Sequence, residues 1–440
     1  MAQSETSPGQ PPEPQGEAGL FALLGVTPAE TLEGGELPAG PALLLSLRGR
    51  LAGLTAGQVL ELRSRNRELG EDLRAWCRLN GCELTTVLDA GDHLRFFITK
   101  GRGAAAWGTP DWGVRLTQRR PGTIDLRDWF VGRAGDVPDE APTYYGFIPR
   151  GAVPEPGMPA LPFTLNRKLD VWADNLPDLY EQAKAQQWNA TTDVPWASLA
   201  PLPDELERAV CQIMTFLAEN EYAALYIPAK FLPRINARYA EAVLFLGTII
   251  NDEARHIEAF TKRALANGGG LQYAAALTEW SLQSLLVQED YFRSSFLLHV
   301  LGEGTFLDLL EFIERFAPDP ATADVARRAR LDEGRHVAYG IAHVRAHLQR
   351  EPASVVELAA ATEERAAALQ ATSGANPVVM HALAVLAGGG AAPLQLAGGL
   401  DAVRALYKQM AENRVRRLLQ IGLDAATAAR LSELHTPNFM

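Results

Sequence analysis

Residues 249–260 read IINDEARHIEAF, and the central DEARH places two acids, an arginine and a histidine inside an apolar run. On an α-helix, side chains three, four and seven positions apart lie on one face. Glu253 shares its face with apolar neighbours on both sides, which are Leu246, Ile249, Ile250, Ile257 and Phe260. His256 follows one turn later, so its imidazole can point at the same place as the carboxylate. We therefore expect both groups to face a helical core.

A second stretch, ARLDEGRHVAYG at residues 329–340, repeats this arrangement. Glu333 and His336 have the same spacing, and an aspartate precedes the glutamate in both copies, Asp252 in one and Asp332 in the other. A single Glu-x-x-His on a helix usually belongs to a solvated face. Two copies with matching flanks favour one site shared by two helices.

Two further glutamates occupy positions where a core helix normally carries leucine. In CQIMTFLAENEYAALYI, Glu221 falls on the apolar stripe, whereas Glu219 falls on a more polar one. In FLLHVLGEGTFLDLLEF, Glu303 falls on the apolar stripe, and Glu311 lies among charged side chains. Helical periodicity therefore predicts that Glu221 and Glu303 face inward and that Glu311 faces water.

Four buried carboxylates require a compensating positive charge, because burying each one alone costs several kcal/mol. Two divalent cations would neutralise them, and two imidazoles would complete the ligand set of a four-helix dimetal site. Carboxylates combined with imidazoles suit iron or manganese better than zinc or calcium. The sequence thus predicts a mainly α four-helix bundle, with helices over residues 165–190, 204–235, 238–267, 271–286, 288–316 and 320–350.

The rest of the chain divides by composition. Residues 1–40 are expected to form a disordered or irregular tail, 103–160 an irregular linker or arm, and 161–440 the bundle with its C-terminal helices. Residues 41–102 predict a small α/β unit. In it, PALLLSLRGR and GQVLELRSRN read as strands, RELGEDLRAWCRLNG as a helix, and ELTTVLDAGDHLRFFITK as a hairpin turning near Gly91. The expected order is βαββ.

Charge and cysteine content exclude several classes of function. The net charge of −12 argues against general electrostatic binding to nucleic acid or to an anionic membrane. The N-terminal residues lack an apolar signal segment, so we expect a cytoplasmic protein. The cysteines, Cys77, Cys82 and Cys211, have no CxxC spacing and are expected to be reduced and buried. Residues 378–400 carry no charge, but glycines interrupt them, which favours packed helix ends over a membrane span.

The segments NEYAAL, DEARH, GEGTF and DEGRH resemble those of the ferritin-like diiron oxygenases, over about residues 165–350. Within that group they are most similar to the hydroxylase subunits of bacterial multicomponent monooxygenases and to the small subunit of ribonucleotide reductase. The resemblance implies that Asp252 and Asp332 each hydrogen-bond the ligand imidazole of the other half. It implies six iron ligands, which are Glu221, Glu253, His256, Glu303, Glu333 and His336.

Some positions depart from that family or leave alternatives open. Hydroxylases of the family usually carry threonine where this chain has Leu307, which weakens the assignment as a hydroxylase, and Thr305 is expected to point elsewhere. His299 is either an extra ligand, a donor to a ligand, or a hydrogen-bonded core histidine. A radical-bearing tyrosine also stays open among the residues near the ligands, which are Tyr222, Tyr226, Tyr291 and Tyr339.

The small N-terminal unit is similar to the TusA-type sulfur carriers in its order of segments, LSLRG, LAGLTAGQVLEL, LRAWCRLNGCELTTV and LRFFITKG. That family carries a Cys-Pro-x-Pro segment after its first strand, and this chain lacks it. Persulfide carriage is therefore not expected. We interpret the unit as a docking or regulatory domain.

The resemblance implies a non-haem diiron oxygenase or oxidase that uses O2 to hydroxylate, N-oxygenate or desaturate a small organic substrate. The metal pair is two iron ions, with a manganese and iron pair as the alternative. Because no flavin or Fe–S motif is visible, a reductase or ferredoxin would supply electrons. The alternatives are a radical- or crosslink-generating subunit, a ferroxidase or iron-handling protein, and a metal-stabilised scaffold. A homodimer stays open.

Overall fold

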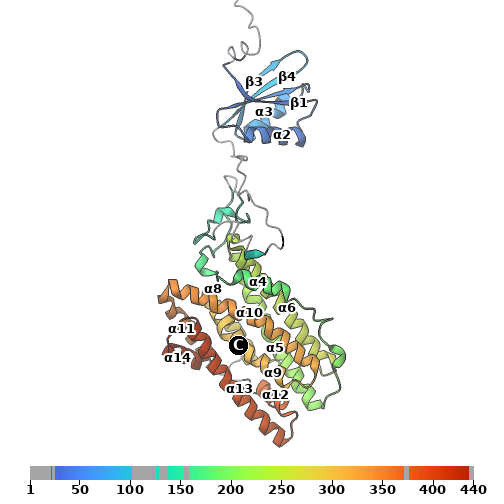
Figure 1. Ribbon diagram of the computed structural model, residues 1–440, viewed down its shortest axis with the longest axis vertical. Helices are drawn as coiled ribbons and strands as arrows, with labels where there is room; N and C mark the ends of the chain where they lie inside the picture. The colour runs from blue at the N-terminus through green and yellow to red at the C-terminus, as the bar shows by residue number, and fades with distance from the viewer. Residues whose placement is uncertain are drawn as a thin grey trace, which may run out of the picture. The chain divides into compact units, whose positions relative to one another are not determined.

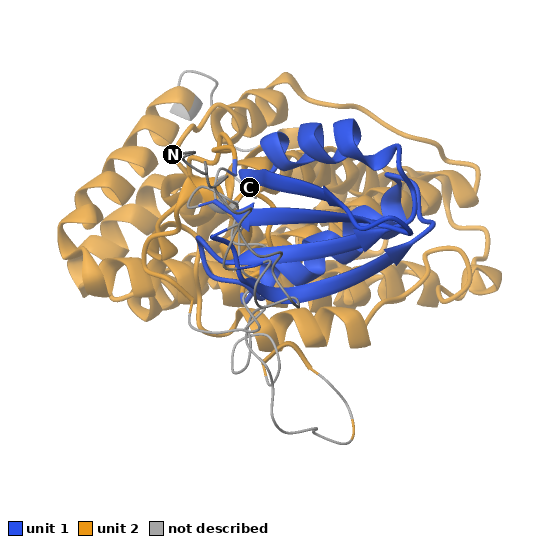
Figure 2. Cartoon of the chain, turned by 90° about the horizontal axis from the view of Figure 1, so that it is seen from above, with its two compact units in different colours: residues 1–119, 151–158 blue, residues 120–150, 159–440 orange. Residues whose placement is uncertain are grey.

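The chain forms two compact units, residues 1–119 with 151–158, and residues 120–150 with 159–440 (Figure 2). The computed structural model describes residues 21, 25–101, 122, 125–127, 137–152, 158–370 and 376–435. Much of the expected tail and much of the expected linker therefore lie outside the described residues.

The first unit is a four-stranded sheet with two helices, in the order β1-β2-β4-β3. β1 runs parallel to β2, and the other neighbours are antiparallel. Leucines from both helices meet the inward side chains of the sheet in one core, so both helices cover the same face. The elements are β1 (Pro28–Gly35), α2 (Pro41–Ala52), β2 (Val59–Ser64), α3 (Leu69–Leu79), β3 (Cys82–Asp89) and β4 (Leu94–Lys100).

The prediction of a strand in PALLLSLRGR was wrong, because this segment is helix α2. Its buried leucines, Leu43, Leu47 and Leu51, recur every four residues, which is a helical period, and Pro41 occupies a favourable first helical position. The first strand lies instead within the expected tail, where PAETLEGG is too polar to resemble a core strand. The order is therefore βαβαββ. The predicted strand at β2, helix at α3 and β3–β4 hairpin are confirmed.

The second unit is built on long helices that correspond to the predicted segments (Figure 1). α8 continues through a π-helical segment, Phe296–Gly302, into α9, so the third long helix of the bundle is broken in register just before Glu303. The expected helix over 165–190 is reduced to α4. The elements are α4 (Leu176–Ala185), α5 (Asp204–Phe231), α6 (Ala240–Ala266), α7 (Ala276–Leu286), α8 (Tyr291–Ser295), α9 (Glu303–Phe316) and α10 (Pro320–Arg350).

The chain ends in helices that pack on this bundle, with α12 against α5 and α13 against α9. Gly389 adopts a left-handed conformation with φ of 69° and closes α12, and Pro393 opens α13, as expected for packed helix ends. The helices are α11 (Val355–Gln370), α12 (Pro377–Gly388), α13 (Pro393–Gln420) and α14 (Ala425–His435).

A bilayer-spanning helix would need about 20 consecutive apolar residues. Over the described ranges, no single helix has the length and apolar character for this. Only α12 and α13 taken together meet the criterion, and they are bent by 111° at their junction.

Candidate metal centre

The structure brings together all six residues that the sequence singled out as metal ligands. Four helices contribute: α5 supplies Glu221, α6 supplies Glu253 and His256, α9 supplies Glu303, and α10 supplies Glu333 and His336. None of the six side chains is more than 1% exposed. The predicted inward orientation of Glu221 and Glu303 is confirmed, and Glu311 is exposed as predicted.

The six side chains fall into two overlapping groups, in each of which the candidate ligand atoms lie within 4.8 Å of one another. One group is Glu221, Glu253, His256 and Glu333, and the other is Glu253, Glu303, Glu333 and His336. Glu253 and Glu333 belong to both groups. They therefore occupy the positions from which a carboxylate can bridge two ions.

Each imidazole turns its Nδ1 atom towards the carboxylates. Nδ1 of His256 lies 3.1 Å from Glu253 Oε2 and 3.5 Å from Glu333 Oε1. Nδ1 of His336 lies 3.0 Å from Glu253 Oε1 and 3.3 Å from Glu333 Oε2. The remaining glutamates are farther away, with Glu221 Oε1 3.6 Å from His256 Nδ1 and Glu303 Oε1 4.0 Å from His336 Nδ1. Each imidazole thus has one terminal carboxylate of its own.

The other face of each imidazole meets an aspartate from the opposite Asp-Glu-x-x-His motif. His256 Nε2 donates to Asp332 Oδ2 at 3.1 Å, and His336 Nε2 donates to Asp252 Oδ2 at 3.3 Å. A proton held at Nε2 by a carboxylate leaves Nδ1 as a lone-pair donor. The crossed pattern therefore fixes both rings with Nδ1 directed into the site.

Two arginines that the sequence analysis missed neutralise these aspartates. Arg255 Nη2 donates to Asp252 and, at 3.0 Å, to Asp332 Oδ2. Arg335 Nη2 donates to Asp332 and, at 3.1 Å, to Asp252 Oδ2. Trp188 also contacts one of the aspartates, because its Nε1 donates to Asp332 Oδ2 at 2.8 Å. The repeated Arg before each histidine was a visible signal for the arginines.

The buried carboxylates of the site are stable in their ionised form only when positive charge compensates them. Burial raises the pKa of Glu221, and the charge of Glu253 adds to the rise. Burial and the charge of Glu333 likewise raise the pKa of Glu303. Burial opposes the charged form of His256, but its bonds to Asp332 and the glutamates raise its pKa. In the absence of cations, protons would therefore supply the compensating charge, and metal binding would displace them.

Unpartnered polar atoms test whether the residues fit a metal pair. Among the described residues, both carboxylate oxygens of Glu221 and of Glu333 lack a hydrogen-bond partner, as do Oε1 of Glu253 and of Glu303 and Nδ1 of His336. Buried polar atoms are nearly always partnered in folded proteins. Their number, their convergence and their chemistry fit two ions that accept oxygen and nitrogen ligands, such as iron or manganese.

His299 lies beside the site on the π-helical segment and is buried. Its Nδ1 lies 2.6 Å from Glu303 Oε2, so one carboxylate oxygen of Glu303 is held by this imidazole. π-Helical turns inside α-helices are frequent at functional sites because they re-aim side chains. Here the turn places both His299 and Glu303 on the inner side of the helix.

The sequence left open the roles of Thr305 and of four tyrosines near the ligands, and the structure separates these tyrosines by their burial. Thr305 is buried, and its Oγ1 donates to the carbonyl of Leu301. Tyr291 and Tyr339 are buried, with their hydroxyls 2.7 Å apart. Tyr222 and Tyr226 are 50% and 53% exposed.

In the N-terminal unit, Cys77 and Cys82 are buried and not disulfide-bonded. Burial raises the pKa of Cys77 to about 12, so its thiol is a poor nucleophile at neutral pH. Because the first strand is β1, the segment that follows it is residues 36–40, and not the LAGLTAG stretch expected from the sequence. It contains no cysteine either.

Comparison with known proteins gives a match for the N-terminal unit. The family described as sulfurtransferase TusA matches residues 39–100. The putative sulfur carrier protein YrkI of Bacillus subtilis (strain 168) is 33% identical over 63 residues, which is 14% of this chain and 84% of that protein.

Solved structures similar to the chain include mutants of an R2-like ligand-binding oxidase. One is a mutant with an aerobically reconstituted Fe/Fe cofactor, which matches with a TM-score of 0.44 and 20% sequence identity. The match covers 57% of this chain and 94% of the chain of that structure. Another, with an aerobically reconstituted Mn/Fe cofactor, has a TM-score of 0.42 and 21% identity with the same coverage.

Proposed function

Through residues 39–100 the chain belongs to the sulfurtransferase TusA family, and we propose that its helical unit is a dimetal oxidoreductase that uses O2 to oxidise a small organic substrate. The observation that carries the proposal is the convergence of four buried glutamates and two imidazoles with their free lone pairs directed at one another. Oxidation here means hydroxylation, N-oxygenation or desaturation.

The ligand set divides the work among named residues. Glu221 and His256 would hold one ion, Glu303 and His336 the other, and Glu253 and Glu333 both. Two iron ions, or one manganese and one iron, would supply the reduction of O2 and the oxidation of the substrate. The protein holds the ligands in fixed positions and excludes water from the space around them.

The outer residues keep this arrangement rigid. Asp252 and Asp332 hold the rings, and Arg255 and Arg335 balance the aspartate charges, so the ligands do not need to reorganise when metal binds. Apolar side chains buried on α6 around Glu253 exclude water from the site, among them Leu246, Ile249 and Phe260.

Turnover as an oxygenase would require electrons from another protein, a reductase or a ferredoxin. Iron–sulfur clusters are held by sets of cysteine thiolates, usually four, whereas this chain has three cysteines, all buried, of which Cys211 lies far in sequence from Cys77 and Cys82. For the N-terminal unit we propose a docking or regulatory role, because the segment after its first strand has no thiol to carry sulfur.

A second candidate, a subunit that forms a protein radical, is favoured by one observation. The buried Tyr291–Tyr339 pair is hydrogen-bonded, and the Tyr339 ring lies edge-on to His299, which in turn contacts Glu303. Oxidation at the metal site could draw an electron along this path.

The test is anaerobic reconstitution with ferrous iron followed by O2. We expect about two ions per chain and O2 consumption coupled to oxidation of an added substrate in the presence of a reductant. Glu253→Gln is expected to abolish stoichiometric binding, whereas the exposed Glu311→Gln is the matched control that leaves it unchanged.

Other outcomes would select other functions. A stable tyrosyl signal in electron paramagnetic resonance, lost in Tyr339→Phe, would favour the radical subunit. Accumulation of many ferric ions per chain would favour iron storage. Far fewer than two ions per chain, with no effect of Glu253→Gln, would contradict a dimetal centre.

A further inference from the structure

The two halves of the candidate metal centre differ in the carboxylate oxygens that they offer. Each half has one glutamate that stands apart from the Asp-Glu-x-x-His motifs, Glu221 on α5 and Glu303 on α9. Among the described residues, both carboxylate oxygens of Glu221 lack a hydrogen-bond partner, whereas only Oε1 of Glu303 does. The other oxygen, Glu303 Oε2, lies 2.6 Å from Nδ1 of His299. One half therefore has one free carboxylate oxygen fewer than the other.

This difference comes from the position four residues before each glutamate. That position is His299 before Glu303 and Leu217 before Glu221. Leu217 is fully buried, and its side chain has no group that can donate a hydrogen bond to a carboxylate. The imidazole of His299 has one. A single residue thus makes two otherwise matched halves unequal.

The helix opposite His299 provides the space for its imidazole. Gly340 follows His336 by four residues, and a Cβ atom at Gly340 would come within 2.4 Å of His299 Cβ. In the other half, the residue four positions after His256 is Phe260, whose ring centroid lies 6.1 Å from that of His256. An aromatic ring therefore fills α6 at the place where α10 has only a hydrogen atom. The sequence differs between the halves at both positions that accommodate the third histidine.

The contact between His299 and Glu303 is expected to persist when metal binds. A carboxylate must be ionised to serve as a metal ligand, and an ionised carboxylate can only accept hydrogen bonds. Nδ1 of His299 would then be the donor, and hydrogen bonds to ionised groups are stronger than those between neutral groups. Both side chains are only 1% exposed, so bulk water does not compete for either of them. Oε2 of Glu303 therefore stays with the imidazole while Oε1 is free for an ion.

We propose that His299 is a positioning residue that restricts Glu303 to one ligand oxygen, so that the ion held by Glu303 and His336 keeps an open position for a small external ligand. Catalytic metal sites in proteins keep such a position, whereas structural sites are closed by protein ligands. The inference rests on the proposed function of the helical unit and adds to it the end of the metal pair at which O2 enters.

The experiment uses the full chain reconstituted with ferrous iron. Mössbauer spectra of the anaerobic protein report whether the two ions have the same surroundings. We expect two distinct quadrupole doublets of equal area. After oxidation, the protein is titrated with azide, a small anion that binds open positions of ferric iron, and the charge-transfer absorption band is followed. We expect one azide per chain.

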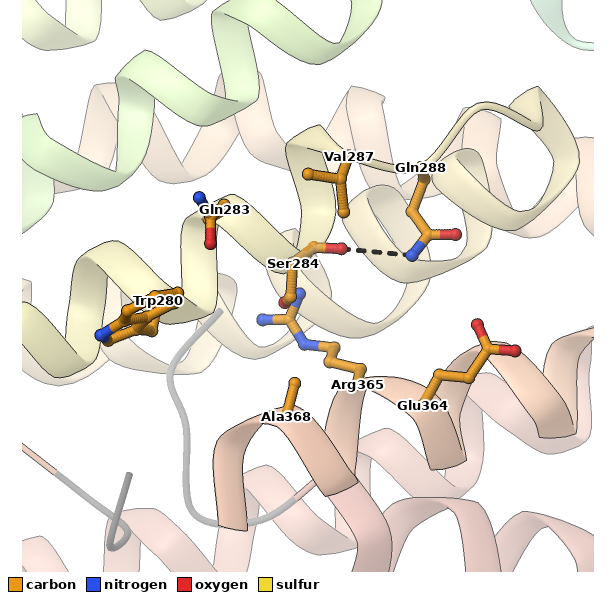
Figure 3. A pocket seen from close by; sticks show the side chains of 8 residues that line it. All are labelled: Trp280, Gln283, Ser284, Val287, Gln288, Glu364, Arg365 and Ala368. Atoms are coloured by element: carbon orange, nitrogen blue, oxygen red, sulfur yellow. Dashed lines mark hydrogen bonds between the residues drawn. The ribbon is translucent and has the colours of Figure 1, made fainter. Parts of the chain in front are cut away.

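The charge-transfer band limits the measurement to azide that is bound to ferric iron. A cavity of about 530 Å³ has walls from α7 and α11 (Figure 3), and the described residues that line it include neither His299 nor a candidate metal ligand. Azide bound in that cavity would produce no such band. The titration therefore reports on the metal centre alone.

Variants of His299 test its role. His299→Leu copies Leu217 of the other half and frees both oxygens of Glu303, so we expect the doublets to converge and azide to bind at least about tenfold more weakly. His299→Asn places an amide N–H close to the position of Nδ1 and is expected to keep both the spectrum and the azide affinity. His381→Leu, at an exposed position on α12, is the matched control and should behave as the unaltered chain does.

Thermal unfolding shows which variants fold. If His299→Leu does not, His299→Met replaces it, because methionine adapts to irregular spaces and has no N–H group. The inference is overturned if the two ions of the unaltered chain are equivalent, or if the folded His299→Asn loses azide binding as His299→Leu does. It is also overturned if azide binds to His299→Leu as tightly as to the unaltered chain, or more tightly, which is expected if the imidazole is itself a metal ligand.

These outcomes separate the inference from the proposed function. Each of them can be observed only in a chain that binds about two iron ions, so each leaves the dimetal centre standing. Failure of the unaltered chain to bind iron would instead overturn both.

Discussion

Asp332 accepts hydrogen bonds from His256 Nε2, Trp188 Nε1 and Arg255 Nη2, so one carboxylate orients a candidate ligand from another helix. Asp332→Asn removes the negative charge and presents an amide in its place. The ring of His256 then loses the acceptor that fixes its tautomer. We expect affinity for ferrous iron to fall about 10- to 100-fold, measured by competition with a chelator. Asp401→Asn, at an exposed position on α13, is the control, and equal affinity in both variants would show that Asp332 does not position the ring.

The six candidate ligands could be found from the sequence because each stands on an apolar helical stripe at a fixed spacing. Their outer partners were harder to predict. Trp188 follows α4 and meets Asp332 across 144 positions of sequence. No periodicity links two residues so far apart, because the contact is created by the packing of helices. The arginines carry a repeat, but only the structure shows that each one reaches both aspartates.

At the scale of elements, the π-helical segment before α9 depends on space provided by α10. A Cβ atom at Gly340 would come within 2.4 Å of His299 Cβ, whereas one at Gly334 meets nothing within 4 Å. We expect Gly340→Ala to lower the free energy of unfolding by about 1–3 kcal/mol and to reduce metal occupancy, because His299 must move. Gly334→Ala, on the same helix, should instead raise it by up to about 1 kcal/mol. Urea unfolding measures both. Equal effects of the two variants would refute the steric argument.

The long helices were predicted to within a few residues because their apolar stripes run over many turns. α6 spans Ala240–Ala266, where 238–267 was expected. The errors fell on short elements. An apolar run of ten residues in α2 fits a buried strand or a buried helix equally well by composition, and β1 carries too few apolar side chains to stand out from a loop. The π-helical register shift left no signal in the sequence that periodicity could detect.

At the scale of the whole helical unit, a buried ion network joins three helices. Arg263 on α6 donates to Glu207 on α5 at 2.7 Å and to Asp319, the N-cap of α10, at 3.0 Å. Burial alone would raise the pKa of Glu207, but its bonds from Arg263 and Asn267 hold it below the ordinary value of 4.5. Its ionised form therefore stabilises the fold above pH 4.5, and this contribution disappears as the pH falls through the lower folded-state pKa.

Glu207→Gln tests this pH dependence. We expect the variant to be about 1–2 kcal/mol less stable than the unaltered chain at pH 7. The difference should shrink below about pH 4, where the carboxylate is protonated in both states. Denaturant unfolding at a series of pH values measures it. Glu205→Gln, exposed on the same turn of α5, should show no such pH-dependent difference, and a difference that stayed constant down to pH 3 would argue against ionisation as the cause.

The two units have separate hydrophobic cores among the described residues, since the cluster of the sheet unit and that of the helical unit share no side chain. All six candidate metal ligands lie in the helical unit. A chain that begins at residue 120 is therefore expected to retain helical circular dichroism and about two ions per chain after reconstitution. Metal analysis and thermal unfolding measure this, with the full chain as the reference. Loss of metal by a shortened chain that keeps its helical content would mean that the TusA-family unit takes part in forming the site, because separate cores alone give no reason for such a loss.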